Sequence, residues 1–538
     1  MRSLIRFTLG MGLGWLATAF TALPSLSAER ITFFYPPFGQ FSVATKDLEI
    51  FAKEGRVTDE LAFYTRRATP EQLAVVQDLL RRRFQMSPAT VANVAYSPFG
   101  EHVLRRLGEV LQTESKQNGF SALRAAAILA AADREGLTVM NLLRRFPLET
   151  IRLDLTEGQQ VFGELSQLFK EKNLLFSAIQ QQAVKEAAEV DFSTLPDLRL
   201  PGQINWRKET LNVTNPNRRL SFPTDIYLPQ GTLTPAPLVV ISHGVASDRN
   251  SFAYLAQHLV SYGFAVAVLE HPNTSATETE QFLSGFAPSA DPVGWVNRPL
   301  DVKYLLDELE QKSQSDPDWQ GQMNLQQVGV LGHSLGGYTV LALAGAKPNF
   351  ARLRQRCSQI EPSQALNLAV LLQCRATDLP LANANLQDPR VKAVLAINPV
   401  TSTIFGQEGL SQIQVPLMMV AGTEDYFTPP VPEQILPFTW LTTPNKYLVL
   451  TAGGTHFSFL GGEGQKTLPS SELIGPDPAL ARPSMDALST AFFKTHLANQ
   501  PEYSPYLNQS YVSSISQSPF ALSLVQSLKA AQPELARR

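Results

Sequence analysis

One serine in this chain stands between a predicted strand and a predicted helix. Residues 328–337 read Val-Gly-Val-Leu-Gly-His-Ser-Leu-Gly-Gly, and an apolar, alanine-containing segment follows at 338–344. A Gly-x-Ser-x-Gly sequence in this context makes a turn so tight that the positions flanking Ser334 must lack side chains, and it strains the serine while exposing its hydroxyl. We therefore predict that Ser334 is a nucleophile. The alternative is an ordinary loop between a strand and a helix.

A nucleophilic serine needs a general base, which is most often histidine. The chain has seven histidines. Three lie in segments that we predict to be helical, and three precede or adjoin the serine: His102, His258 and His496, then His243, His271 and His333. Only His456 follows a predicted strand, residues 447–451, and stands in a glycine-containing loop downstream of the serine. His456 is therefore the predicted base.

The overall composition is that of a soluble globular protein. The 538 residues carry a formal charge of −3, and 44% of them are apolar. A chain of this length can form two or three bodies with substantial cores. The balanced charge gives no sign of a nucleic-acid partner, and the three arginines at 81–83 suit the negative end of a helix. No cysteine or histidine spacing indicates a metal site, and we expect no cofactor.

The first 28 residues have the pattern of an export signal. Two arginines precede an apolar segment at residues 7–23, and cleavage is expected near Ala28. Leu26 is larger than the residue usually found at such a site, so an uncleaved anchor stays open as the alternative. A segment of this length and composition spans a bilayer poorly, however. We therefore favour a signal peptide at residues 1–28.

Residues 29–190 are predicted to form a mainly helical domain without a catalytic constellation. Short β-like runs at 30–35 and 150–154 enclose amphipathic segments and could pair across them. Helical periodicity recurs in four segments, the first of which starts with a capping box at Thr69: residues 69–80, 98–112, 121–135 and 157–190. A stretch rich in Pro, Asp and Leu at 191–203 indicates a linker.

Residues 204–500 alternate strand and helix signals, which predicts an α/β domain with a mostly parallel sheet. Strands at 237–241 and 264–269 enclose a predicted helix, as in a parallel crossover. A polar, glycine- and serine-rich excursion at 271–297 is long enough for a functional loop over the site, although its tip could be simply mobile. After the α/β domain, residues 501–538 form a tail with no identifiable chemistry.

An insertion at residues 348–387 interrupts the α/β domain. It contains several leucines and the chain's two cysteines, Cys357 and Cys374. In an oxidising compartment the cysteines could form a disulfide, and otherwise they are two buried thiols. An apolar, cross-linked cap would suit an acyl or lipid substrate, whereas a packed helix would make no substrate contact, and the sequence favours neither.

Four motifs of the α/β domain together resemble the α/β-hydrolase family, in particular plasma-type platelet-activating-factor acetylhydrolases and predicted dienelactone hydrolases. They are Ile241-Ser242-His243-Gly244, Leu269-Glu270-His271, Arg298-Pro299-Leu300-Asp301 and Gly332-His333-Ser334-Leu335-Gly336-Gly337. The resemblance covers roughly residues 200–498 and implies an α/β-hydrolase fold with serine ester hydrolysis. It also implies that the backbone amides of Val245 and Leu335 form the oxyanion hole.

The hydrolase pattern places a carboxylate between the serine and the histidine along the chain. A predicted buried strand at 415–422 leads into a turn that contains Asp425, our predicted triad acid. Glu424 is the alternative, and Asp425 could also be a simple turn aspartate. The acetylhydrolase pattern has its aspartate where this chain has Asn398, and an amide cannot supply the charge that stabilises imidazolium. The acid is therefore expected on the following strand.

The N-terminal domain resembles the uncharacterised helical domain found in front of cyanobacterial hydrolases, through residues 35–39, 125–133 and 149–153. The leading hypothesis is an exported serine carboxylic-ester hydrolase acting on lipid or other acyl esters, including short-acyl phospholipids. The alternatives are an acyltransferase with the same triad and a non-catalytic interaction protein that retains the fold. The expected partner is a small-molecule or lipid ester, while a peripheral membrane contact and the helical domain's partner stay open.

Overall fold

The computed structural model describes residues 27–529 apart from 67, 193, 217, 359–366, 380–384 and 463–473. The predicted export signal therefore lies almost wholly outside the described residues. The chain divides into two compact units, Met1–Gln160 and Val161–Arg538. Among the helices that the structure describes, none combines the length and apolar surface that a bilayer-spanning segment requires.

The boundary between the units lies inside one long helix rather than at residue 190, where the sequence placed it. This helix is α9 (Leu155–Glu186), and the Asp154 side chain accepts hydrogen bonds from the backbone N–H groups of its first turn. Leu175 and Ile179 of its second half are buried in the core of the second unit. The continuous helical periodicity of this segment gave no sign that its two halves belong to different units.

The N-terminal unit combines helices with a small sheet. Its strands are ordered β2-β1-β6-β4. The two β-like runs, which the sequence suggested could pair, are β1 and β6, and they pair in parallel. The strands are β1 (Arg30–Tyr35), β2 (Gly39–Ala44), β4 (Leu111–Gln112) and β6 (Thr150–Leu153), with a ribbon of β3 (Arg83–Phe84) and β5 (Leu137–Thr138). The helices are α2 (Thr45–Glu54), α3 (Asp59–Thr65), α4 (Pro70–Arg81), α5 (Pro88–Tyr96), α6 (Pro98–Val110), α7 (Phe120–Ala131) and α8 (Val139–Arg144).

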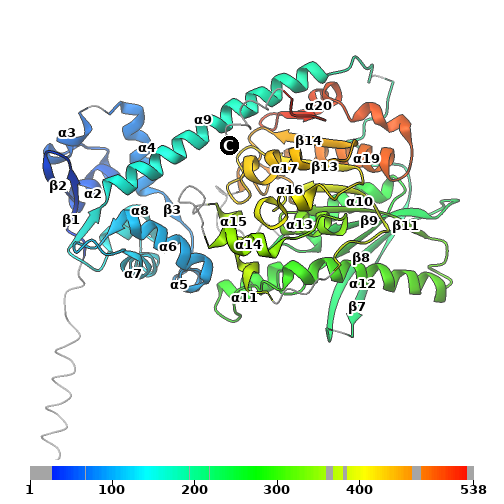
Figure 1. Cartoon of the computed structure of the whole chain (residues 1–538), viewed down its shortest axis with the longest axis horizontal. Helices are drawn as coiled ribbons and strands as arrows, with labels where there is room; N and C mark the ends of the chain where they lie inside the picture. The colour runs from blue at the N-terminus through cyan, green and yellow to red at the C-terminus, as the bar shows by residue number, and fades with distance from the viewer. Residues whose placement is uncertain are drawn as a thin grey trace, which may run out of the picture. The chain divides into compact units, whose positions relative to one another are not determined.

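The second unit is built around a nine-stranded sheet in the described part of the chain, ordered β15-β14-β13-β12-β11-β9-β10-β8-β7 (Figure 1). The six strands from β10 to β14 in this order run parallel, which confirms the predicted fold class. The strands are β7 (Trp206–Asn215), β8 (Leu220–Pro229), β9 (Ala236–Ser242), β10 (Ala265–Leu269), β11 (Met323–His333), β12 (Val391–Ile397), β13 (Leu417–Gly422), β14 (Lys446–Thr451) and β15 (Leu522–Val525).

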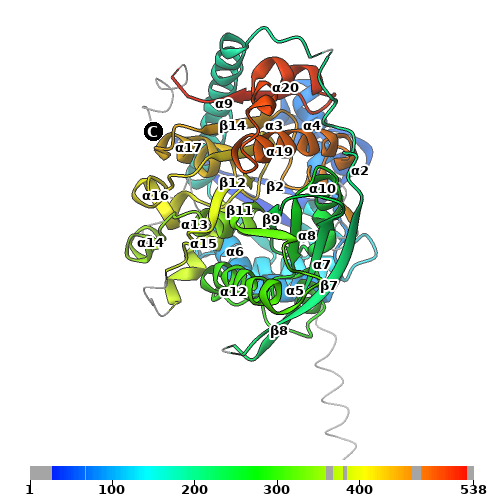
Figure 2. The same cartoon turned by 90° about the vertical axis from the view of Figure 1, so that its right-hand side faces the viewer.

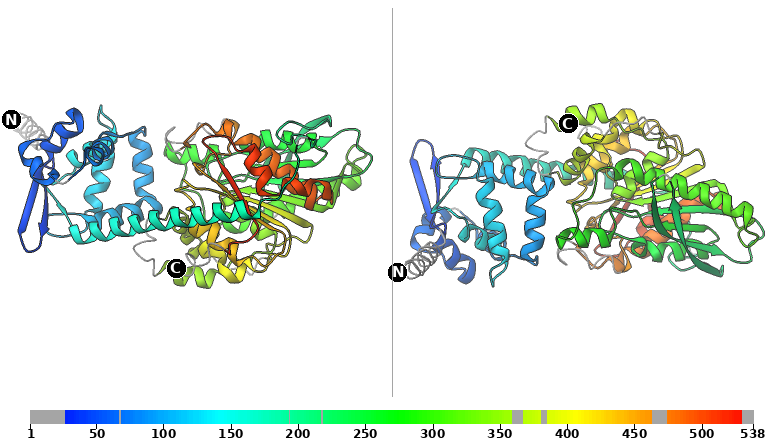
Figure 3. Two further views of the ribbon diagram at one scale, coloured as in Figure 1. Left: turned by 90° about the horizontal axis from the view of Figure 1, so that it is seen from above. Right: turned by 90° about the horizontal axis from the view of Figure 1, so that it is seen from below.

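Helices cover both faces of this sheet because its strands bury side chains on both sides. Along β9, Leu238 and Val240 pack into one core, while Val239 and Ile241 pack into the other. The first face carries α12 (Gly294–Ser315), α13 (Leu335–Leu343), α16 (Ser402–Leu410), α17 (Leu436–Trp440) and the second half of α9, and the other carries α10 (Ala253–Ser261), α19 (Arg482–His496) and α20 (Gln509–Ile515). Figures 2 and 3 show these layers from three further directions.

Two segments of the second unit differ from their sequence-based descriptions. The tail after residue 500 is not separate, because α20 packs on the sheet and β15 pairs antiparallel with β14. The excursion expected at 271–297 ends earlier than predicted, because α12 already begins at Gly294. Just before this helix, the Asp291 side chain accepts a hydrogen bond from the N–H of Val293. The excursion before it contains the short helix α11 (Ala276–Leu283).

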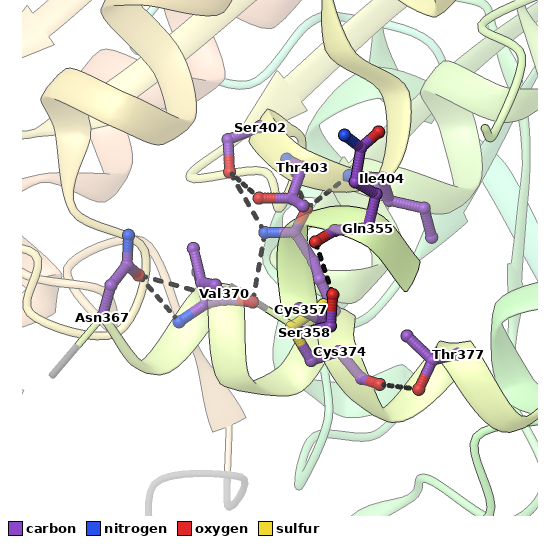
Figure 4. The surroundings of a disulfide bond; sticks show 12 residues. Gln355, Cys357, Ser358, Asn367, Val370, Cys374, Thr377, Ser402, Thr403 and Ile404 are labelled. Atoms are coloured by element: carbon purple, nitrogen blue, oxygen red, sulfur yellow. Dashed lines mark hydrogen bonds between the residues drawn. A yellow bond between two sulfur atoms is a disulfide. The ribbon is translucent and has the colours of Figure 1, made fainter. Parts of the chain in front are cut away.

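The insertion at 348–387 forms packed helices joined by a disulfide. Cys357, at the end of α14 (Phe350–Cys357), is bonded to Cys374, at the end of α15 (Leu368–Cys374), as Figure 4 shows. Leu353 and Ala369 lie in the core, and Gln373 accepts hydrogen bonds from the N–H groups of Thr403 and Ile404. The described part of the insertion is therefore packed against α16; residues 359–366 and 380–384 lie outside the described residues.

Candidate active site

Ser334 occupies a strained turn between β11 and α13. Its backbone has φ 56° and ψ −120°, a conformation that side-chain-bearing residues rarely adopt and that costs about 1–3 kcal/mol. The flanking glycines are required by space. A Cβ on Gly332 would lie 2.1 Å from the Gly336 carbonyl oxygen, and a Cβ on Gly336 would lie 2.0 Å from the Ser242 carbonyl oxygen. The predicted strand, tight turn and helix are therefore all present around Ser334.

Asp425 and His456 are hydrogen-bonded to each other at the ends of neighbouring parallel strands. Asp425 follows β13 and His456 follows β14, and the His456 Nδ1 lies 2.7 Å from the Asp425 Oδ2. Asp425 is only 2% exposed, and its Oδ1 accepts hydrogen bonds from the N–H groups of Phe427 (2.8 Å) and Thr428 (2.7 Å). These donors hold the carboxylate in place. A carboxylate at Nδ1 fixes the imidazole tautomer whose Nε2 is free to accept a proton.

Glu424, the alternative acid, points to a different partner. Its carboxylate accepts a hydrogen bond from the Lys172 ammonium on α9 at 3.0 Å, and its side chain is 40% exposed. The same ammonium also donates to the Thr423 carbonyl at 3.1 Å. Glu424 thus helps to anchor the turn to α9, whereas Asp425 alone faces His456.

Asn398 ties the end of β12 to the two loops that carry the acid and the histidine. Its Oδ1 accepts a hydrogen bond from the Gly422 N–H at 2.9 Å. Its Nδ2 donates to the carbonyls of Thr455 (3.3 Å) and His456 (3.4 Å). An aspartate at position 398 would point an anionic oxygen at two carbonyl oxygens. This repulsion gives a physical reason why the carboxylate that contacts His456 follows β13 instead of β12.

His333 connects the serine's turn to the loop that carries His456. Its Nε2 donates to the His456 carbonyl at 2.8 Å, and the two rings are 4.7 Å apart between centroids. Ser334 is 7% exposed and His456 is 6% exposed. The structure therefore brings the neighbour of Ser334 against the Asp425–His456 pair in a mostly buried site.

The loop after β9 lies directly against the serine, where the sequence predicted half of an oxyanion hole. A Cβ on Gly244 would lie 3.1 Å from the Ser334 Cβ, so the backbone approaches the serine closely because residue 244 is glycine. In the described part of the chain, the N–H groups of Val245 and Leu335 have no hydrogen-bond acceptor. Both amides are therefore available to a ligand, and that of Leu335 opens α13, where the helix dipole favours an anion.

Burial keeps three neighbouring imidazoles neutral. Burial, together with the Arg298 cation, lowers the pKa of His243 to about 3. Burial also lowers the pKa values of His271 and His333 well below the usual value. None of these three rings carries a proton charge at neutral pH. Within the described residues, no three His, Cys, Asp or Glu side chains form a cluster that could hold a metal ion.

The sequence analysis missed two residues that hold this site. Thr428 donates its hydroxyl hydrogen to the Asp425 Oδ2 at 2.7 Å, and Asn398 acts as described above. The Asp-Tyr-Phe-Thr spacing is a turn pattern in which Thr428 could have been expected to contact Asp425. No local signal identifies Asn398, because its partners come from loops 24 and 58 residues away.

Two family models match separate parts of the chain. The model described as "Alpha/beta hydrolase of unknown function" matches residues 27–154, and "Platelet-activating factor acetylhydrolase, isoform II" matches residues 227–314. The second match contains the loop after β9 but not Ser334, Asp425 or His456. The platelet-activating factor acetylhydrolase of Cavia porcellus is 25% identical over 134 residues, which are 20% of this chain. The chain spans 31% of the length of this curated relative.

The second match covers β9 and β10 of the nine-stranded sheet, together with the loop after β9. The resemblance to acetylhydrolases suggests a serine ester hydrolase. The chain is an α/β hydrolase in fold, and it resembles the platelet-activating-factor acetylhydrolases.

Proposed function

We propose that this protein hydrolyses carboxylic esters, with Ser334 as nucleophile, His456 as general base and Asp425 as the acid that orients the histidine. The observation that carries the proposal is the buried 2.7 Å Asp425–His456 pair beside a strained serine at the carboxyl edge of the sheet. A purely structural turn would have no reason to keep Ser334 in an unfavourable conformation. The resemblance to acetylhydrolases supports an acyl-ester substrate.

In the proposed reaction, the Ser334 Oγ attacks the ester carbonyl carbon while the His456 Nε2 takes the hydroxyl proton. The resulting oxyanion accepts hydrogen bonds from the N–H groups of Val245 and Leu335. Collapse of this intermediate breaks the bond to the alkoxide, which leaves with the proton from His456. Water then attacks the acyl-enzyme by the same proton route and releases the carboxylic acid.

The resemblance favours short-acyl phospholipids as the substrate class. We also propose that the protein is exported across a membrane. Both are parts of the proposal. A series of esters with acyl chains of different length reports directly on how much acyl chain the site accepts.

The proposal is tested by ester hydrolysis with a matched pair of serine variants. Wild type, Ser334→Ala and Ser358→Ala are assayed with p-nitrophenyl acetate, butyrate and octanoate, and with phospholipids that carry an acetyl or a palmitoyl group at position 2. Ser358 is an exposed serine on the insertion and serves as the control. We expect Ser334→Ala to lose roughly three orders of magnitude or more in kcat and Ser358→Ala to retain wild-type rates. Equal hydrolysis by wild type and Ser334→Ala would contradict the proposal.

A further inference from the structure

Arg298 is a buried cation close to the proposed oxyanion hole. Arg298 belongs to α12, and the residue is 1% exposed. In the described part of the chain, no carboxylate lies within ion-pair distance of its guanidinium. The carboxylate nearest to it along the helix, Asp301, is hydrogen-bonded to Arg218 instead. Arg298 is thus charged, buried and without a direct counterion.

An arginine in this position is costly for the fold. Burial lowers its pKa, and the Asp301 charge only partly opposes this effect. Removing a cation from water costs several kcal/mol unless it is paired. A neutral amide or hydroxyl could satisfy the same acceptors at lower cost, so fold stability alone does not account for an arginine here.

The guanidinium of Arg298 donates hydrogen bonds to the loop after β9 and to a residue that itself contacts this loop. One terminal nitrogen donates to the His243 carbonyl, and the other donates to the Thr274 hydroxyl at 3.2 Å. The Thr274 carbonyl in turn accepts a hydrogen bond from the Ala246 N–H at 3.1 Å. Arg298 therefore links residues 243–246 to the segment that follows β10.

The next peptide of this loop is also held. The His243 Nδ1 donates to the Gly244 carbonyl at 2.7 Å, and its Nε2 accepts the N–H of His271 at 2.9 Å, which fixes the tautomer. The Gly244 carbonyl and the Val245 N–H belong to one planar trans peptide and point in opposite directions. Holding the carbonyls of His243 and Gly244 therefore determines where the Val245 N–H points.

We propose that Arg298 is a positioning residue for the oxyanion hole: it anchors the His243 carbonyl so that the Val245 N–H faces the reacting carbonyl oxygen, and its buried charge favours the anionic intermediate. This inference rests on the proposed ester hydrolysis. It predicts that Arg298 acts on the transition state and not on substrate binding, because the oxyanion exists only after attack.

The test compares Arg298→Met and Arg298→Lys with Arg390→Met. Arg390 is another mostly buried arginine, but it precedes β12 and pairs with Asp388 and Asp307 at the opposite end of the parallel strands from Ser334. For each variant, kcat and KM are measured with p-nitrophenyl acetate, together with inhibition by a trifluoromethyl ketone that forms an anionic adduct with the serine. Thermal unfolding gives stability separately.

We expect Arg298→Met to lower kcat about 100- to 1000-fold with KM changed less than about threefold. The ketone's inhibition constant should rise in parallel with the loss of kcat/KM. Arg298→Lys should lose about tenfold, because one ammonium retains the charge but cannot span both acceptors in the fork geometry. Arg390→Met should unfold at lower temperature with kcat unchanged.

The inference is overturned if folded Arg298→Met keeps kcat within threefold of wild type, or if its loss lies in KM. Should Arg298→Met fail to fold, Arg298→Lys decides: an unchanged kcat and unchanged ketone inhibition reject the role. Failure of the proposed function would look different, because wild type itself would then neither hydrolyse esters nor bind the ketone, and the positioning role would fall with it.

Discussion

Moving the proposed triad carboxylate from the turn after β13 to the end of β12 should give an inactive protein. The change combines Asp425→Asn with Asn398→Asp, which places the acid where the acetylhydrolase pattern has it. We expect Asp425→Asn alone to lower kcat by about 10⁴-fold, because an amide favours the wrong imidazole tautomer. The double variant should remain equally inactive.

The expected cost follows from what surrounds Asn398. Its Nδ2 makes two long hydrogen bonds, of 3.3 and 3.4 Å, to the carbonyls of Thr455 and His456, and together they contribute about 1 kcal/mol. An aspartate loses both bonds and adds a buried, unpaired charge, which costs about 3–5 kcal/mol. The free energy of unfolding of Asn398→Asp should therefore fall by roughly 4–6 kcal/mol at pH 7.

Urea denaturation at pH 7 measures this loss, and p-nitrophenyl acetate hydrolysis measures kcat for the wild type, both single variants and the double variant. Asn398→Ala is the control without a charge. It removes both Nδ2 bonds and also the bond from the Gly422 N–H, and it should still lose less stability than Asn398→Asp. Recovery of kcat to within tenfold of wild type in the double variant would refute the assignment of separate roles to Asn398 and Asp425.

Three further outcomes follow from the packing, the buried histidines and the disulfide. Gly336→Ala should lose at least about 3 kcal/mol in urea denaturation, because its Cβ would meet the Ser242 carbonyl oxygen at 2.0 Å and backbone cannot retreat as a side chain can; an unchanged midpoint would contradict this. Burial lowers the pKa of His496 to about 4, below an unfolded value of about 6.5, so the unfolded chain binds more protons between these values and stability falls as the pH drops from about 6.5 to about 4. His496→Gln should remove up to about 3 kcal/mol of that loss, whereas equal acid sensitivity of both proteins in pH-dependent denaturation would exclude it. Replacing Cys357 and Cys374 together by serine opens a cross-link between residues separated by 17 in sequence. The free energy of unfolding should fall by about 3 kcal/mol without reductant, and dithiothreitol should not lower it further in the variant. A variant as stable as the oxidised wild type would show that the cross-link has no such effect.

The features that the sequence predicted best are those with local steric rules. The glycines around Ser334 are required by contacts of about 2 Å. The prediction of His456 rested on its place in a loop after a strand. Asp425 required the order of strands, because a carboxylate in a turn is common and Glu424 lies next to it. In the structure Asp425 lies 2.7 Å from His456, whereas Glu424 pairs with Lys172, and these contacts support the proposal of Asp425 as the acid.

Other features depend on partners distant in sequence and left no local signal. The strand β15 is four residues long in a serine-rich tail, and its partner β14 lies more than 70 residues earlier. The division inside α9 left no signal in the sequence, because the helical periodicity of residues 157–190 continues across it. Arg298 carried the family resemblance, but only the fold places its guanidinium on the His243 carbonyl.

The central claim is that Ser334 is an activated nucleophile, and adduct mapping with a fluorophosphonate tests it most directly. The full-length protein is labelled, digested and analysed by mass spectrometry, alongside Ser334→Ala and Asp425→Asn. The account predicts a single phosphonylated peptide containing Ser334, no adduct in Ser334→Ala, and much slower labelling in Asp425→Asn. A folded wild-type protein without an adduct at Ser334, or with labelling that survives Ser334→Ala, would contradict it.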